Sequence, residues 1–261
     1  MKKLPIAIQC AAVAGLIMAG GLSASAQTLM LQLQASNYNP ITGVWTDTSG
    51  NSDNATYSGS SIPTLLAGVT QNGSSAVNLS GNGSLVLSSA LGYSSGYTVF
   101  AFIKPTTGVG RNALTGGSVN NALEYDIYNG PQDYLREYLQ DVGHGNATIS
   151  TSSFSLVDLA VNSSGASFNL NGASDGTVGG ATFGSAITRI GNNEGGGDGF
   201  VGDLSEIDIY SGVLTAGQIS TVESQLTASY VTPVPEPTAW AMMAGVFGIM
   251  LAARPFRRPQ T

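Results

Sequence analysis

Two acidic residues occur at alternate positions of a short apolar segment in two places in the chain. Glu206 and Asp208 stand in "GDLSEIDIY", and Glu124 and Asp126 stand in "LEYDIY". Alternate side chains of a β-strand point to the same face, so each pair would present two carboxyl groups together. Two carboxyl groups about 5–5.5 Å apart can hydrolyse a glycosidic bond with retention of configuration, one as nucleophile and one as acid/base. The spacing raises the question of whether the chain does such chemistry.

The position that should hold the acid/base is occupied by tyrosine in both segments. The first segment resembles the catalytic strand of retaining β-glucanases, which carries E-[ILV]-D-x-x-E or the shorter E-[ILV]-D-x-E. In this chain Tyr210 and Ser211 follow Asp208, and Tyr128 and Asn129 follow the second pair. Tyrosine has a reference pKa near 10, too high to protonate a leaving oxygen at neutral pH. Half of the machinery is missing, so no catalytic residue is assigned, and only a carboxylate from another loop could supply it.

Other catalytic or metal-binding patterns are weaker still. His144 is the only histidine and Cys10 the only cysteine, whereas zinc sites need several such ligands. The segment "GNNEGGGDG" is glycine-rich but lacks the lysine of a phosphate-binding loop, and a hairpin loop is the simpler interpretation. These patterns point to neither zinc nor nucleotide chemistry.

The two ends of the chain differ from its middle. Residues 1–26 have a basic start, a short apolar run and Ala24-Ser25-Ala26, which predicts a secretory signal peptide cleaved before Gln27. Cys10 lies in this leader, so the mature chain would have no disulfide. The formal net charge is −7, and only Glu236 of the 16 acidic residues lies outside the middle. Without a basic patch, nucleic acid is excluded as a partner.

The C-terminal segment, residues 232–261, has three parts in a fixed order. Pro235-Glu236-Pro237 comes first, an uncharged stretch over 238–253 follows, and the basic end 254–258 closes the chain with Arg254, Arg257 and Arg258. Sixteen helical residues span about 24 Å, at the short limit for a bilayer core of about 30 Å.

This order of parts closely resembles the PEP-CTERM sorting signal of Gram-negative bacteria. The resemblance implies export through the inner membrane, a transient membrane anchor in the C-terminal helix, and processing by an exosortase near the Pro-Glu-Pro motif. It also implies delivery to the cell envelope surface or extracellular matrix, often alongside exopolysaccharide. The alternative is an ordinary tail anchor.

The middle, residues 27–231, predicts an all-β domain. Short runs of alternating apolar and polar residues are separated by Gly, Ser and Asn turns, as expected for a two-sheet antiparallel sandwich. The expected strands cover 29–35, 75–80, 84–89, 97–105, 154–162, 166–172, 186–192 and 202–210.

One helix is expected after the last of these strands. Thr215 and Gln218 form a capping box, and Ile219, Val222 and Leu226 then fall on one face, spaced for packing against a sheet.

Several motifs in the middle together resemble the laminin G-like jelly roll of the concanavalin A-like lectin/glucanase superfamily. "RIGNNEGGGDGFVGDLSEIDIYSGVLTAGQIS" resembles its closing segment, "VWTDTSGNSDNATY" an upstream motif, and "YTVFAFIKP" its first long strand. The resemblance covers roughly residues 29–231 and implies a jelly-roll sandwich with one short C-terminal helix.

The same resemblance implies a structural calcium ion. Relatives often hold one, which makes Asp47, Asn51 and Glu206 candidate ligands. The segment is no EF-hand, because Ser52 replaces the required glycine and Ser58 the bidentate glutamate. The alternative is that Asp47 and Asn51 cap a turn by bonding nearby backbone.

The tyrosine-rich stretch 124–140 offers a candidate ligand site. Tyr128, Tyr134 and Tyr138 could stack on sugar rings. The alternative is that these tyrosines are half-buried strand residues with one polar end in water.

The sequence thus predicts an exported, non-catalytic surface or matrix protein that binds or adheres, with polysaccharide as the candidate partner. A glycoside hydrolase with a displaced acid/base and a purely structural surface-coat protein are the alternatives, since a fold alone names no ligand.

Overall fold

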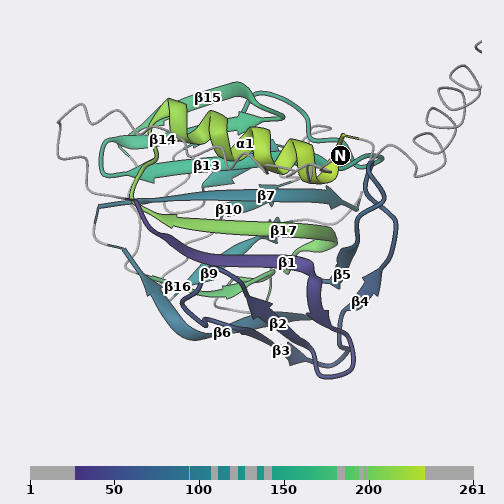
Figure 1. Cartoon of the computed structure of the whole chain (residues 1–261). Helices are drawn as coiled ribbons and strands as arrows, with labels where there is room; N and C mark the ends of the chain where they lie inside the picture. Colours follow the sequence, from purple (N-terminus) through teal and green to yellow (C-terminus); the bar gives the residue numbers. More distant parts are fainter. Residues whose placement is uncertain are drawn as a thin grey trace, which may run out of the picture.

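The computed structural model describes residues 27–93, 95–106, 111–117, 123–126, 134–137, 143–180, 186–193, 197 and 199–232. Within this part the chain forms antiparallel β-strands and one C-terminal helix, which confirms the all-β antiparallel sandwich (Figure 1). None of the described helices is long and apolar enough to cross a membrane. The predicted leader, the Pro-Glu-Pro motif, the apolar span 238–253 and the basic end 254–258 lie outside the described residues.

The first layer runs β15-β14-β13-β7-β17-β1, with β5 beside β17 and β4 beside β5. Its strands are β1 Leu29–Asn39, β4 Thr64–Leu66, β5 Ala76–Ser80, β7 Tyr97–Pro105, β13 Ser155–Asn162, β14 Gly165–Leu170, β15 Ala173–Gly179 and β17 Val201–Ser211.

The second layer continues from the end of β1 in the order β2-β3-β6-β16-β9. The far end of β1 turns away from β17 and pairs with β2 through Tyr38 and Asn39, past an irregularity in the ladder (Figure 1). The strands of this layer and of a small separate sheet, β12-β11-β10-β8, are β2 Val44–Asp47, β3 Ala55–Gly59, β6 Gly83–Gly92, β8 Arg111–Ala113, β9 Thr115–Gly117, β10 Leu123–Asp126, β11 Tyr134–Glu137, β12 Gly143–His144 and β16 Ala186–Ile190.

The main core lies between the two layers. It includes the inward side chains of β7 and β13 and, from the second layer, Trp45, Leu85 and Ile190, each fully buried. In β1, Leu31, Leu33 and Ala35 alternate with polar residues and face this core, as expected for a strand with one buried face.

Strand β7 is apolar on both faces because each face is covered. Val99, Ala101 and Ile103 face the main core, whereas Phe100 and Phe102 belong to a second buried cluster on the outer side of the sheet. Helix α1, Ala216–Tyr230, covers that second cluster and contacts β7 and β13 (Figure 1).

The helix begins as the sequence predicts. Gln218 donates its backbone N–H to Thr215 Oγ1, and Thr215 donates its backbone N–H to Gln218 Oε1, so the capping box is confirmed. Val222 and Leu226 are buried against the sheet and Ile219 is partly buried. The predicted amphipathic face is therefore correct, and Tyr230 extends it by one more turn.

Candidate functional site

The acidic segment on β17 contains a β-bulge that decides which side chains face outward. The ladder between β17 and β7 pairs Leu204 with Ile103 but Glu206 with Phe102, so the register shifts across Ser205. As a result Leu204 joins Ile207 and Ile209 in the main core. Simple alternation places Leu204 on the same face as Glu206 and Asp208, and that prediction is wrong because the bulge inserts one extra residue.

Glu206 is buried on the outer side of the sheet and is fully occupied by hydrogen bonds. It is 2% exposed. Its Oε1 accepts from Gln32 Nε2 at 2.9 Å and from Gln34 Nε2 at 3.1 Å, both on β1. Its Oε2 accepts from the Tyr230 hydroxyl of α1 at 2.5 Å. Glu206 therefore joins β17, β1 and the helix, as a buried acid must if its charge is to be tolerated.

Asp208 lies on the same face two residues further along and is 3% exposed. Burial, followed by the charge of Glu206 and a hydrogen bond with it, holds the pKa of Asp208 well above its ordinary value. Burial and the neighbouring charge therefore favour the neutral form of the Asp208 carboxyl. The pair has the composition of a catalytic dyad, but both of its residues are buried in the folded protein.

A second acidic contact joins the helix to the sheet. Asp158 on β13 is 1% exposed, and Asn169 Nδ2 donates to its Oδ1 at 2.8 Å. Burial, then the charge of Glu223 on α1 and a hydrogen bond with it, raises the pKa of Asp158 to about 8. Asp158 lies opposite Phe100, which lies opposite Asp208, so both acidic contacts occupy one row across the sheet.

Tyr210 occupies the position at which the glucanase pattern E-[ILV]-D-x-E carries its acid/base. Burial, then the charges of Asp208 and Glu206, raises the pKa of Tyr210 to about 12. Its ring meets the edge of Phe100 with centroids 5.9 Å apart. A phenol with so high a pKa is poorly matched to protonating a leaving group at neutral pH.

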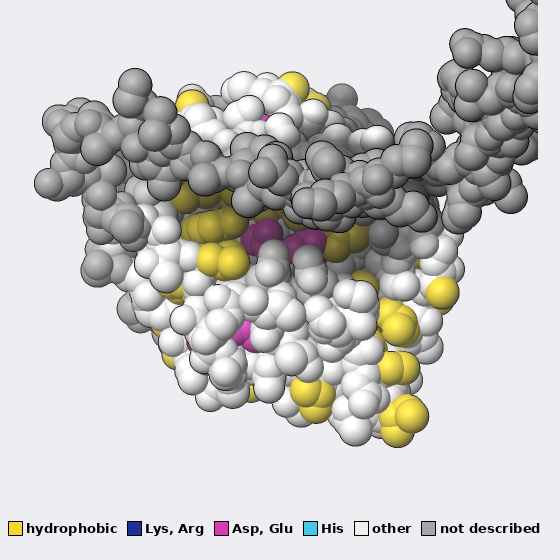
Figure 2. All heavy atoms as spheres, viewed as in Figure 1, with side chains coloured by type: hydrophobic (Ala, Val, Ile, Leu, Met, Phe, Trp, Pro, Cys, Tyr) yellow, Lys and Arg dark blue, Asp and Glu magenta, His cyan; other side chains and the backbone are white. Residues whose placement is uncertain are grey.

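The face that carries this acidic row is hollowed beside α1. Figure 2 shows acidic side chains at the floor of the hollow with hydrophobic side chains next to them. A pocket of about 320 Å³ lies beside Gln34 and Tyr230. Another of about 430 Å³ lies beside Tyr210 and Val222. Pockets of this size can hold small molecules.

Two of the calcium candidates, Asp47 and Asn51, share Ser49 as a hydrogen-bond partner. Asp47 accepts backbone N–H groups from Gln32 and Ser49 at Oδ1 and from Asp53 at Oδ2. Burial opposes ionisation of Asp47, but these hydrogen bonds, with that of the Ser49 hydroxyl, outweigh it and lower its pKa. Asn51 Nδ2 donates to the backbone carbonyls of β1 at 2.9 and 3.0 Å.

This geometry is the turn-capping arrangement that the sequence leaves open as the alternative. Gln32 links Asp47 to Glu206, because it donates its backbone N–H to the first and its side-chain amide to the second. Among the described residues, no group of three or more His, Cys, Asp or Glu could hold a metal ion. Calcium at Asp47, Asn51 and Glu206 stays a prediction.

Most of the other candidate residues fall outside the described part of the chain. Tyr128, Tyr138 and the sorting residues are among them, and of Tyr134 only the backbone is described, in β11. His144 pairs with Arg136 in the small sheet through its backbone. A sugar-stacking role for the three tyrosines stays a prediction.

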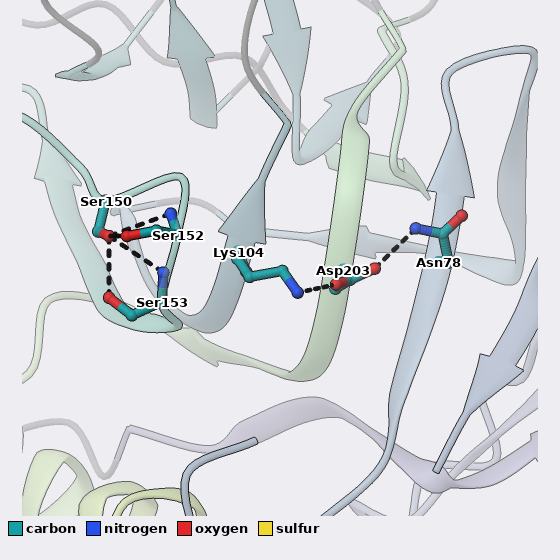
Figure 3. A network of polar contacts seen from close by, with 6 residues as sticks. All are labelled: Asn78, Lys104, Ser150, Ser152, Ser153 and Asp203. Atoms are coloured by element: carbon teal, nitrogen blue, oxygen red, sulfur yellow. Dashed lines mark hydrogen bonds and ion pairs between the residues drawn. The ribbon is translucent and has the colours of Figure 1, made fainter. Parts of the chain in front are cut away.

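An ion pair borders the outer cluster at the other end of β7. Lys104 Nζ lies 2.6 Å from Asp203 Oδ2, and Asn78 Nδ2 donates to Asp203 Oδ1 at 2.6 Å (Figure 3). Lys104 also lies over the ring of Phe154, 5.2 Å from its centroid. A separate group, Ser150 with Ser152 and Ser153, closes its own turn (Figure 3). The first group links β5, β17 and β7, and the second group holds the loop before β13.

The sequence alone did not identify the partners of the acidic residues. Gln32 and Gln34 occupy the polar phase of "LMLQLQA", a signal that they share one outward face. Tyr230 follows Leu226 at a spacing of four and so extends the helix stripe. Nothing in the sequence indicates that β13 and α1 bring Asp158 and Glu223 together.

A two-layer antiparallel sandwich with its closing strand under a short helix defines a lectin- or glucanase-like class of fold. The chain belongs to the concanavalin A-like lectin/glucanases superfamily, whose Laminin_G_3 model matches residues 79–220. No curated protein matches the chain.

Solved structures with the same fold come from proteins of several kinds. Domain 4 of AbnA, a GH43 extracellular arabinanase from Geobacillus stearothermophilus in complex with arabinotriose, is 18% identical with a TM-score of 0.54, covering 76% of this chain and 98% of that chain. The binding domain of Paraclostridial Mosquitocidal Protein 1 is 15% identical with a TM-score of 0.52, covering 76% and 52%. Trypanosoma rangeli sialidase is 19% identical with a TM-score of 0.51, covering 78% of this chain and 33% of that chain. At these identities the likeness shows the fold.

Proposed function

We propose that this chain is an exported, non-catalytic binding protein that holds polysaccharide at the cell surface or in the surrounding matrix. The observation that carries the proposal is the state of the acidic segment on β17. Glu206 is buried and its oxygens are occupied by Gln32, Gln34 and Tyr230, while Tyr210 stands at the acid/base position. Carboxyl groups that act on a glycan must reach it, and these serve the fold instead.

The comparisons support a glycan as the ligand. Domain 4 of AbnA has this fold over nearly its whole length and was solved with arabinotriose. In AbnA the fold forms one domain of a larger enzyme, and that domain binds a sugar. We infer the same kind of sugar-binding role for this chain.

Export and sorting belong to the same proposal. Residues 1–26 would direct export, and the tail with Pro235-Glu236-Pro237 would be processed by an exosortase after its apolar span 238–253 has anchored it. The processed domain would then meet polysaccharide outside the inner membrane. Structural calcium is part of this proposal only if metal binds near Asp47.

A glycan array, run alongside a panel of soluble glucans, arabinans and xylans, tests the function. Retention without new reducing ends is the expected result. New reducing ends would mean a hydrolase with an acid/base from another segment. If the protein neither retains nor hydrolyses any glycan, the result would favour a structural surface-coat role.

A further inference from the structure

One pocket on the outer face has the chemistry of a sugar subsite. It lies between the first turn of α1 and the end of β17 and has a volume of about 430 Å³. Tyr210 from β17 and Leu214 and Val222 from the helix segment supply its apolar wall. Thr215, Gln218, Thr221 and Gln27 supply the polar groups. None of its lining residues, all of them described, carries a charge.

The amide groups of this pocket are held in place by hydrogen bonds. Gln27 Nε2 donates to the carbonyl of Val213 at 3.0 Å. Gln218 Nε2 donates to Gln27 Oε1 at 3.2 Å, while Gln218 Oε1 accepts from Thr215 as part of the helix cap. Fixing the rotamers in advance lowers the entropy that a ligand must overcome. The cap therefore orients the polar rim of the pocket as well as starting the helix.

Tyr210 supplies a half-buried aromatic surface beside these amides. Its ring is braced edge-on by Phe100, at 5.9 Å between centroids. An aromatic ring with a polar tip offers an apolar face for the C–H side of a sugar ring, and amides and hydroxyls pair with its hydroxyl groups. An anionic ligand would be repelled by the charge of the buried acids Asp208 and Glu206, which lie behind Tyr210 on the same strand and act on its hydroxyl.

We propose that this pocket binds rings of a neutral glycan, with Tyr210 as the stacking platform and Gln27 and Gln218 as the hydrogen-bonding rim. The inference rests on the proposed glycan-binding function and names a site for it on the outer face of the sheet, beside α1. It is independent of the tyrosine-rich segment 124–140.

The chain offers a blocking variant with a matched control. A Cβ built on Gly217, at the pocket, meets no atom within 4 Å, and neither does one built on Gly179, at the end of β15. The backbone therefore accepts a Cβ at either position, and at Gly217 a leucine also favours the helix. Gly217→Leu fills part of the pocket, whereas Gly179→Leu adds the same group elsewhere on the surface.

Calorimetric titration of the processed protein tests the site. The probes are short linear arabinan, xylan and β-glucan oligosaccharides, with polygalacturonate as an acidic probe. We expect binding of a neutral oligosaccharide that Tyr210→Leu weakens about tenfold or more, as loss of a stacked ring implies. Gly217→Leu should weaken binding similarly, and Gly179→Leu should leave it within about twofold. Thermal melts of each variant confirm that the fold is retained.

The outcomes separate the site from the function. Binding that survives Gly217→Leu and Tyr210→Leu overturns the site and leaves the glycan-binding function standing. Loss on Gly179→Leu instead would move the site to the depression beside β14 and β15. Preference for polygalacturonate would refute a neutral ligand, and no binding of any probe by the unmodified protein would overturn both proposals.

Discussion

Asp158 is expected to make the protein less stable as the pH rises from about 4 to 8. Burial and Glu223 raise the pKa of Asp158 from 3.8 to about 8 in the folded protein. Between these values the folded protein keeps a proton that the unfolded chain has released. Stability from this group is thus complete below pH 4 and is lost as the pH passes through about 8.

The size of the effect follows from the same numbers. Each pKa unit corresponds to about 1.36 kcal/mol, so the rise from 3.8 to about 8 sets an upper bound of roughly 6 kcal/mol. Water entry and side-chain relaxation reduce the cost of a buried ion in proteins to a few kcal/mol. We therefore expect a loss of about 2–4 kcal/mol in unfolding free energy between pH 4 and pH 8 from this contact.

Asp158→Asn removes the charge while keeping the shape. Its side-chain oxygen can still accept from Asn169, and its new amide can donate to Glu223. The variant should match the unmodified protein at pH 4 and exceed its unfolding free energy by about 2–4 kcal/mol at pH 8. Urea unfolding followed by circular dichroism at several pH values measures this directly.

The partner variant makes the test specific. Glu223→Gln removes the other carboxyl of the contact, so it should flatten the same pH dependence, and the double variant should add little to either single change. If Asp158→Asn is less stable than the unmodified protein at pH 8, or if its pH dependence is unchanged, the raised pKa of Asp158 beside Glu223 is refuted.

Three further predictions address the other acidic residue, the metal and the ends of the chain. Tyr230→Phe keeps the ring stacked on Phe102, 5.0 Å away, but removes a donor from Glu206, so unfolding free energy should fall by about 1–3 kcal/mol in urea titrations; an unchanged value would mean that the bond contributes nothing. If calcium binds at Asp47 and Asn51, metal-loaded protein should melt at a lower temperature after chelation, because a ligand of the folded state stabilises it by mass action, and an unchanged melt would favour the turn cap. Mass spectrometry of native protein should find an N-terminus near Gln27 and cleavage near Pro235-Glu236-Pro237, and an intact "RPFRRPQT" end would exclude exosortase processing.

Local sequence patterns predicted those elements whose ends are set by residues close together in the chain. The capping box at Thr215 and Gln218 fixes the start of α1 through contacts three residues apart. The segment "VNSSGASFNLNG" predicts a hairpin with a Gly-containing turn, and β13 and β14 pair across that turn with Asn162 opposite Gly165. Such features depend on neighbours in the chain, so they can be read without the fold.

Contacts between distant segments could not be predicted in the same way. The sequence gives no sign that Asp158 meets Glu223, or that Gln32 and Gln34 donate to Glu206, because these contacts depend on strand order and on where α1 is placed. The strands β2 and β3 are short and polar enough on one face that alternation did not separate them from the surrounding turns. Tertiary packing decided these elements.

The bulge at Ser205 explains how an enzyme-like motif can serve as structure. It lets Leu204 enter the main core while Glu206 and Asp208 remain on the outer face, where α1 covers them. Without the extra residue, Leu204 and Glu206 would share a face, and either an apolar side chain would leave the core or a carboxylate would enter it. The buried carboxylate of Glu206 on this strand therefore requires a hydrogen-bond donor from the helix, and the Tyr230 hydroxyl is that donor. Two residues beyond Asp208 on β17, Tyr210 lines the uncharged pocket beside the first turn of α1, which is the proposed glycan site.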